Sequence, residues 1–85
     1  MPYDPDLPLQ RNIHAVIRKY DGYYVATCLE VSAVTDGHTL DETVFNLQEA
    51  ICLLLDGEDP SEFGLVPNPG ITLIYQMELA DVAAA

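Results

Sequence analysis

The sequence has very few basic residues. Only three lysines and arginines stand against fourteen aspartates and glutamates in 85 residues, which gives a net charge of −11. The three cations, Arg11, Arg18 and Lys19, lie in one short segment. Because nucleic-acid binding needs many cations to neutralise phosphates, this balance argues against direct binding of DNA or RNA. A surface this acidic can attract a basic protein partner, or it can simply maintain solubility, and charge alone favours neither.

Long apolar runs and a leader sequence are also missing. No apolar stretch approaches the roughly 20 residues of a membrane-spanning helix. The first ten residues, MPYDPDLPLQ, lack the basic region and apolar run of a secretory signal. We therefore expect a cytoplasmic protein without a membrane partner. Its two cysteines, Cys28 and Cys52, are then expected to be free, buried and apolar in character.

Residue patterns that support catalysis are scarce. His14 and His38 each stand alone in the sequence, without a recognisable partner to orient the ring. Ser32 and Ser61 lie in no GxSxG motif, and no CxxC or Cys/His cluster suggests a metal. The acids gather at turns and on one helix face instead of converging on neighbouring strands. We expect no catalytic residue, no metal and no cofactor, and therefore no enzyme; a residual nuclease or hydrolase is the weakest of three alternatives.

One segment has a strong helical period, and it predicts a helix over residues 40–56. Thr39 is a suitable N-cap, and Glu42 three residues later completes a capping-box pattern. Gly57 is suited to a left-handed stop. The apolar stripe consists of Leu40, Val44, Leu47, Ile51 and Leu54.

The remaining periodicity predicts four strands. Alternating apolar residues indicate strands at 11–20 and 23–29, joined by a two-residue Asp21-Gly22 turn. A shorter strand is expected at 31–35 and a last one at 71–79, with 57–70 as a long irregular connection because of its prolines and glycines. The expected fold is α+β, in the order β-β-β-α-β. It has a three-stranded antiparallel meander, a fourth strand parallel to the first, and one helix on one face.

The chain is expected to form one domain at residues 11–80, with an extended arm at 1–10 and a tail at 81–85. A domain this small buries a limited share of its surface. One helix cannot cover both faces of a four-stranded sheet, so the opposite face needs a second layer, from a homodimer, a higher oligomer or another partner. The apolar residues expected on that face are Val16, Tyr23, Val25 and Ile74.

The run YYVATCLEVSAVTDGHTLDETVFNLQEAICLLL resembles the HicB family of antitoxins. That family has a Tyr-x-Ala strand, a Gly-Asp-Thr-Leu-x-Glu-Ala element that opens a helix, and an Asn-x-x-Glu-Ala-Ile run within it. The chain departs from the pattern at His38, where the family has Asp, and at 32–34, where it often has Pro-Gly-Cys. The matching residues are Tyr24, Ala26, Gly37, Thr39, Leu40, Glu42, Asn46, Glu49, Ala50 and Ile51.

The resemblance implies a fold like a degraded ribonuclease H core without its catalytic acids. It also implies a partner, a small basic HicA-like toxin that cleaves mRNA and whose active site the antitoxin covers. The DNA-binding segment of many relatives is not expected here, so this would be a short form. The alternative is a solitary HicB-like homo-oligomer with a regulatory or scaffolding role and no toxin.

Four acids are candidate contacts for a basic partner. They lie at the expected corner before the helix and on its exposed face, where capping and solubility are their competing roles. The candidate partner-binding residues are Glu30, Asp36, Glu42 and Glu49.

Overall fold

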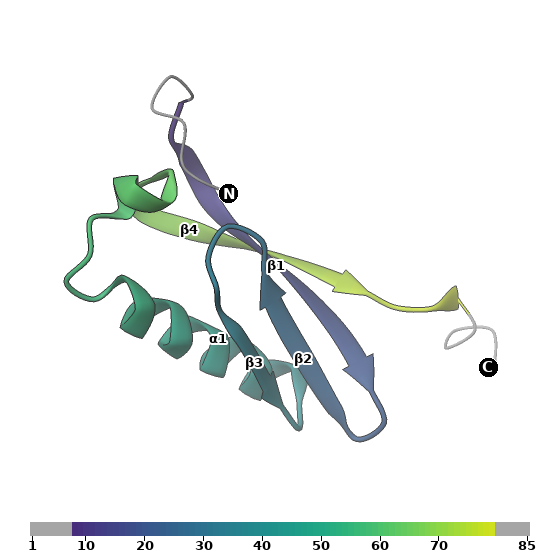
Figure 1. The fold of residues 1–85 in the computed structure, drawn as a ribbon. Helices are drawn as coiled ribbons and strands as arrows, with labels where there is room; N and C mark the ends of the chain where they lie inside the picture. Colours follow the sequence, from purple (N-terminus) through teal and green to yellow (C-terminus); the bar gives the residue numbers. More distant parts are fainter. Residues whose placement is uncertain (1–7, 80–85) are drawn as a thin grey trace.

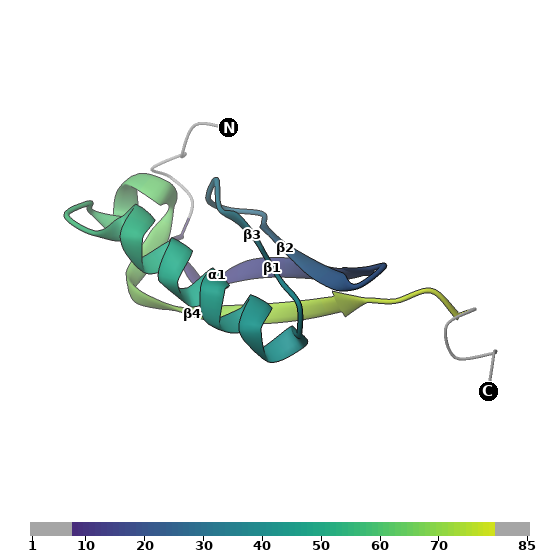
Figure 2. The same ribbon diagram turned by 90° about the horizontal axis from the view of Figure 1, so that it is seen from below.

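The computed structural model describes residues 8–79 as a four-stranded sheet with one helix on one face (Figures 1 and 2). The strand order is β3-β2-β1-β4, which confirms the predicted α+β fold and its β-β-β-α-β order. The tail and most of the arm predicted from sequence lie outside the described residues. The elements are β1 (Gln10–Tyr20), β2 (Tyr23–Cys28), β3 (Val34–Gly37), α1 (Leu40–Leu55), the 3-10 helix η1 (Pro60–Phe63) and β4 (Leu65–Gln76).

The first two strands form the predicted antiparallel hairpin. Tyr20 pairs with Tyr23 across the two-residue turn, and their rings stack with centroids 5.3 Å apart. Gly22 has φ +83°, a left-handed conformation that glycine adopts without steric cost. The same register continues along the hairpin and places Ala15 opposite Cys28.

The third strand differs from the prediction of residues 31–35. It comprises Val34–Gly37, and the chain before it is bent rather than extended. Val31 and Ala33 are nevertheless buried, and the Ala33 N–H donates to the Val31 carbonyl over 2.9 Å. The two residues are apolar because their side chains enter the core from a tight turn. Their alternation in the sequence therefore resembles the pattern of a strand.

The fourth strand is parallel to β1, as predicted, but its bounds are Leu65–Gln76 instead of 71–79. Part of the predicted irregular connection is therefore ordered as η1 and the start of β4. Leu65 is fully buried and pairs with Gln10, after which the register shifts before Gly70 pairs with Asn12. Asn68, within this irregularity, has φ +54°.

The core lies between the sheet and α1. Ile13, Ala15 and Ile17 of β1 are buried on this side, against Leu47 and Ile51 of the helix. The helix ends at Leu55, one residue short of the predicted end, and Gly57 has φ +75°.

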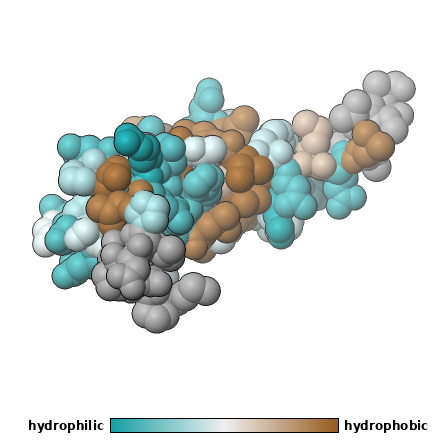
Figure 3. Space-filling view, turned by 90° about the horizontal axis from the view of Figure 1, so that it is seen from above, coloured by the Kyte–Doolittle hydropathy of each residue, from teal (hydrophilic) through white to brown (hydrophobic). Residues whose placement is uncertain are grey.

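The opposite face of the sheet has no covering layer within residues 8–79. Seen from above in Figure 3, apolar side chains gather in the middle of the molecule. The strand registers place Val34, Thr27, Val16 and Ile74 in one row across the four strands.

Candidate functional site

The candidate site is built at the corner where β3 ends and α1 begins. Gly37 is the last residue of β3, and only His38 and Thr39 separate it from the helix. A Cβ atom on Gly37 would lie 2.6 Å from the Thr43 Oγ1 and 2.7 Å from the Thr43 backbone nitrogen. Glycine is therefore required here for close approach of strand and helix, and this approach fixes the shape of the corner.

The start of α1 is held by hydrogen bonds to Thr39. Its Oγ1 accepts from the Glu42 N–H over 3.0 Å, and its carbonyl accepts from the Oγ1 of buried Thr43 over 2.8 Å. Half of the capping box is thus present. The Glu42 carboxylate lies 3.8 Å from His38 Nδ1, and no bond from it to the Thr39 N–H occurs among the described residues.

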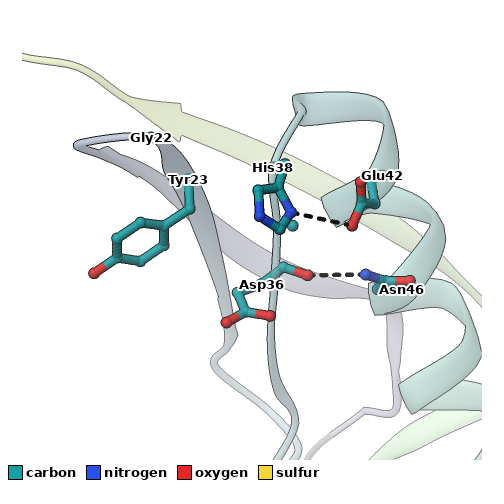
Figure 4. Close-up of a pocket in the computed structure, with 7 residues that line it drawn as sticks. Gly22, Tyr23, Asp36, His38, Glu42 and Asn46 are labelled. Atoms are coloured by element: carbon teal, nitrogen blue, oxygen red, sulfur yellow. Dashed lines mark hydrogen bonds and ion pairs between the residues drawn. The ribbon is translucent and has the colours of Figure 1, made fainter.

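A pocket of about 450 Å³ opens at this corner (Figure 4). Its walls come from the β1–β2 turn, the end of β3 and the first two turns of α1. Asn46 donates from Nδ2 to the Asp36 carbonyl over 2.9 Å, which ties the helix to the strand beneath the opening. The lining residues are Gly22, Tyr23, Asp36, Gly37, His38, Glu42 and Asn46.

The pocket is negatively charged and partly aromatic. Asp36 turns its carboxylate away from α1, toward the side of the strand on which Tyr23 lies, whereas Glu42 turns its carboxylate toward His38 (Figure 4). No lysine or arginine is among the residues that line it. The Asp36 carboxylate on the Tyr23 side and the Glu42 carboxylate beside His38 can each accept a guanidinium or ammonium group through charge-assisted hydrogen bonds. The Tyr23 ring can add a cation–π contact on the Asp36 side.

The structure brings together two of the four acids predicted from sequence, Asp36 and Glu42. Glu49 is exposed and follows Asn46 by three residues, so it lies on the same side of α1 one turn beyond the pocket. Glu30 lies elsewhere, after β2, with its carboxylate hydrogen-bonded to His14.

The His14–Glu30 pair corrects the expectation that His14 stands alone. Glu30 Oε2 lies 2.6 Å from His14 Nδ1, and Glu30 Oε1 accepts from the His14 N–H over 2.6 Å. The Glu30 side chain is only 13% exposed. The hairpin register places Leu29 beside His14, and the Leu29 N–H donates to the His14 carbonyl. A sequence analysis that extended the register from the Asp21-Gly22 turn could have found this pair. Its evident role is to tie the β2–β3 connection to β1.

The two cysteines have different environments. Cys28 is buried as predicted, and burial followed by the negative charge of Glu30 raises the pKa of its thiol. Both effects disfavour the thiolate, so Cys28 is a poor nucleophile. Cys52 is exposed on α1, so the prediction that it is buried was wrong. It faces a hollow between the second half of α1 and the start of β4, which the helix does not close.

Comparisons with protein-family models, curated proteins and solved structures find no match for this chain. Within residues 8–79, no three histidine, cysteine or acidic side chains gather in an arrangement that could hold a metal ion. None of the helices in this part of the chain is both long and apolar enough to span a membrane.

Proposed function

We propose that this protein is the antitoxin of a type II toxin–antitoxin pair. In this proposal it binds a small, basic, HicA-like mRNA ribonuclease in the cytoplasm and covers its active site. The observation that carries the proposal is the acidic pocket at the β3–α1 corner, defined by Asp36 and Glu42 with Tyr23 at its side.

The chemistry of the pocket matches the surface of an RNA-binding enzyme. Such an enzyme holds phosphates with arginine and lysine, and carboxylates can bind the same cationic side chains. Asp36 and Glu42 supply two carboxylates that no lysine or arginine of this chain neutralises within the lining. The net charge of −11 adds a long-range attraction that accelerates encounter with a basic protein.

The position of the pocket also supports the proposal. Three of its lining residues, Gly37, Glu42 and Asn46, belong to the pattern that resembles HicB antitoxins. Gly37 and Asn46 fix the corner, through the close approach to Thr43 and the bond to the Asp36 carbonyl. Two residues of that pattern, Gly37 and Asn46, therefore help to shape this pocket.

The test begins with the open reading frame beside this gene. The proposal predicts a short basic protein whose expression arrests growth and whose toxicity this chain relieves on co-expression. Binding of the purified pair is then measured for Asp36→Asn/Glu42→Gln. The matched control is Glu58→Gln/Glu62→Gln, which removes the same charge from two exposed acids outside the pocket.

We expect the pocket variant to raise Kd by about 10- to 100-fold, because Asn and Gln replace each charge-assisted hydrogen bond, worth about 2 kcal/mol, with a neutral one worth about 1 kcal/mol. The control should change Kd by less than about threefold, since it alters only long-range attraction. Equal effects of the two variants on Kd would show that the pocket is not the surface that contacts the basic protein. Failure of the chain to bind the basic protein or relieve its toxicity would refute the antitoxin function.

A solitary homo-oligomeric regulatory or scaffolding module is the second candidate. The observation in its favour is the exposed apolar surface at the end of β4, where Leu73, Tyr75 and, just after the strand, Met77 are each 40–51% exposed. This function predicts stable self-association and recovery of no basic protein when the tagged chain is isolated from its own cells.

A further inference from the structure

The outer strand β4 has a composition unlike the rest of the chain. Residues 65–77 contain no charged side chain, although the whole chain has fourteen acids and three bases. In the sheet, β4 pairs with β1 on one side only, so the backbone groups of its other side are unpaired within residues 8–79. An exposed, uncharged and apolar edge strand is a ready template for pairing with another strand.

The second half of β4 exposes apolar side chains on both faces of the sheet. Leu73 and Tyr75 pair with Ala15 and Ile17 and therefore lie on the helix side, yet they are 43% and 40% exposed. Ile74 lies on the opposite side and is 43% exposed. Figure 2 shows the reason on the helix side: this half of β4 extends past the N-terminal end of α1, so the helix does not cover it.

The first half of β4 is unsuited to pairing. Pro67 and Pro69 have no N–H to donate, and Asn68 between them has φ +54°. The register with β1 also shifts in this region. The usable surface is therefore residues 70–77, which we call the β4 edge.

We propose that the β4 edge binds the β4 edge of a second copy, antiparallel, about a twofold axis at Ile74. This register places Ile74 against Ile74 of the other copy on one face of the sheet. On the helix side it places Leu73 against Tyr75, so apolar residues meet apolar residues. Outside these, Ile71 meets Met77, and Thr72 meets Gln76. An interface made by one surface with itself closes as a dimer.

Charge identifies the occupant as a second copy. Two chains of net charge −11 repel each other wherever acids face acids, and the β4 edge is where they can meet without doing so. A basic partner would gain no electrostatic attraction at this neutral strand. The opposite edge of the sheet, β3, is only four residues long and carries Asp36, so it does not extend the assembly further.

Edge pairing also accounts for the exposed residues better than stacking of the two uncovered sheet faces. Stacking would bury Ile74 and Val34, which share one row of that face, but it would leave Leu73 and Tyr75 exposed on the helix side. Edge pairing covers Leu73, Ile74 and Tyr75 together and leaves Val34 in solvent, at the other edge of the sheet.

Disulfide trapping tests the twofold axis. In a Cys52→Ser background, Ile74→Cys places two thiols on residues that face each other, about 4.5–5.5 Å apart at Cα, which is within disulfide reach. Thr72→Cys is the control on the same strand and face, because the two copies of residue 72 would be about 13 Å apart. Mild oxidation should give a covalent dimer for Ile74→Cys alone. A dimer from Thr72→Cys would contradict the register, and none from either would contradict the pairing.

Sedimentation equilibrium of the full chain tests the interface without cross-linking. We expect Ile74→Lys to raise the dimer Kd at least tenfold and Val34→Lys to change it less than about threefold. Both residues are exposed in the single chain, so each variant should fold, and circular dichroism checks this. Equal weakening by both variants would indicate face stacking, and a monomeric parent protein would overturn the proposal. The result is independent of the proposed antitoxin function, because the acidic pocket lies at the opposite edge of the sheet.

Discussion

At the scale of single residues, the two cysteines provide a sensitive probe of the fold. Cys28 is 8% exposed, and burial together with Glu30 raises the pKa of its thiol, whereas Cys52 is exposed on α1. Thiolate is the reactive form, so burial and the raised pKa both slow reaction at Cys28, whereas Cys52 is accessible. At about pH 8 we expect iodoacetamide to label Cys52 quickly and to label Cys28 only after unfolding. Peptide mass mapping identifies which cysteine carries the label.

The raised pKa of Cys28 also gives stability a defined pH dependence. Because the folded state holds the protonated thiol, its contribution is complete below the ordinary thiol pKa and is lost as pH rises through the folded-state pKa. As the pH rises from about 8 to 10, the unfolding free energy of Cys28→Ala should therefore fall less than that of the parent protein. Cys52→Ser, the control, should follow the parent. Equal labelling rates for the two native cysteines would contradict this account of the Cys28 site.

At the scale of elements, the β3–α1 corner depends on the missing side chain of Gly37. A Cβ there would approach the backbone nitrogen and Cα of Thr43 within 2.7 and 3.0 Å, so an added methyl must push strand and helix apart. We expect Gly37→Ala to lower the unfolding free energy by about 1–3 kcal/mol in chemical denaturation. Thr43→Ala in the same chain should not restore it, since two of the three close atoms are backbone.

An alanine substitution at a second glycine, Gly22, distinguishes the effect of steric crowding from that of backbone strain. Gly22 has φ +83°, and among the described residues no atom beyond those of Gly22 and its two chain neighbours lies within 4 Å of the position that a Cβ would occupy. Gly22→Ala therefore tests backbone strain without steric crowding. It should cost about 1 kcal/mol, the left-handed penalty alone. If Gly37→Ala were the milder of the two, close packing would not be what holds the corner.

The elements that could be predicted from sequence are those whose signals are local. The hairpin around Asp21-Gly22 and helix α1 each carry their own turn, cap and period, and both formed as expected. The start of β4 could not be predicted in this way, because Pro67 and Pro69 indicate a loop and Leu65 is ordered by pairing with Gln10, 55 positions away in the chain. Asp36 and Glu42 were selected by charge and by position at the helix start. Their shared pocket depends on the turn at Gly22, which is distant in sequence.

At the scale of the whole molecule, two surfaces at opposite edges of one sheet have different physical characters. The pocket edge is acidic and suited to a cationic partner, and the β4 edge is neutral, apolar and suited to a copy of itself. A dimer through β4 would therefore leave one acidic pocket free on each chain. If both proposals hold, the assembly can bind two basic partners, and their sites do not compete with dimerisation.

Salt should act on these two associations in opposite directions. Raising NaCl from about 0.05 to 0.5 M shortens the Debye length from about 14 to about 4 Å. Screening removes the attraction between the −11 chain and a basic partner, so we expect the association rate constant in stopped-flow measurements to fall at least tenfold. The same screening relieves repulsion between two acidic copies, so the dimer Kd from sedimentation should stay constant or decrease, and the melting temperature should rise.

Both trends can be measured on one preparation, and each has its own contrary result. A dimer that dissociates as salt is added would require charged contacts, which the β4 edge does not contain. An association rate that salt leaves unchanged would mean that the acidic surface does not guide the basic partner. Glu58→Gln/Glu62→Gln serves as a control, because it lowers the net negative charge and leaves the two binding surfaces intact. Both salt effects should be smaller in this variant.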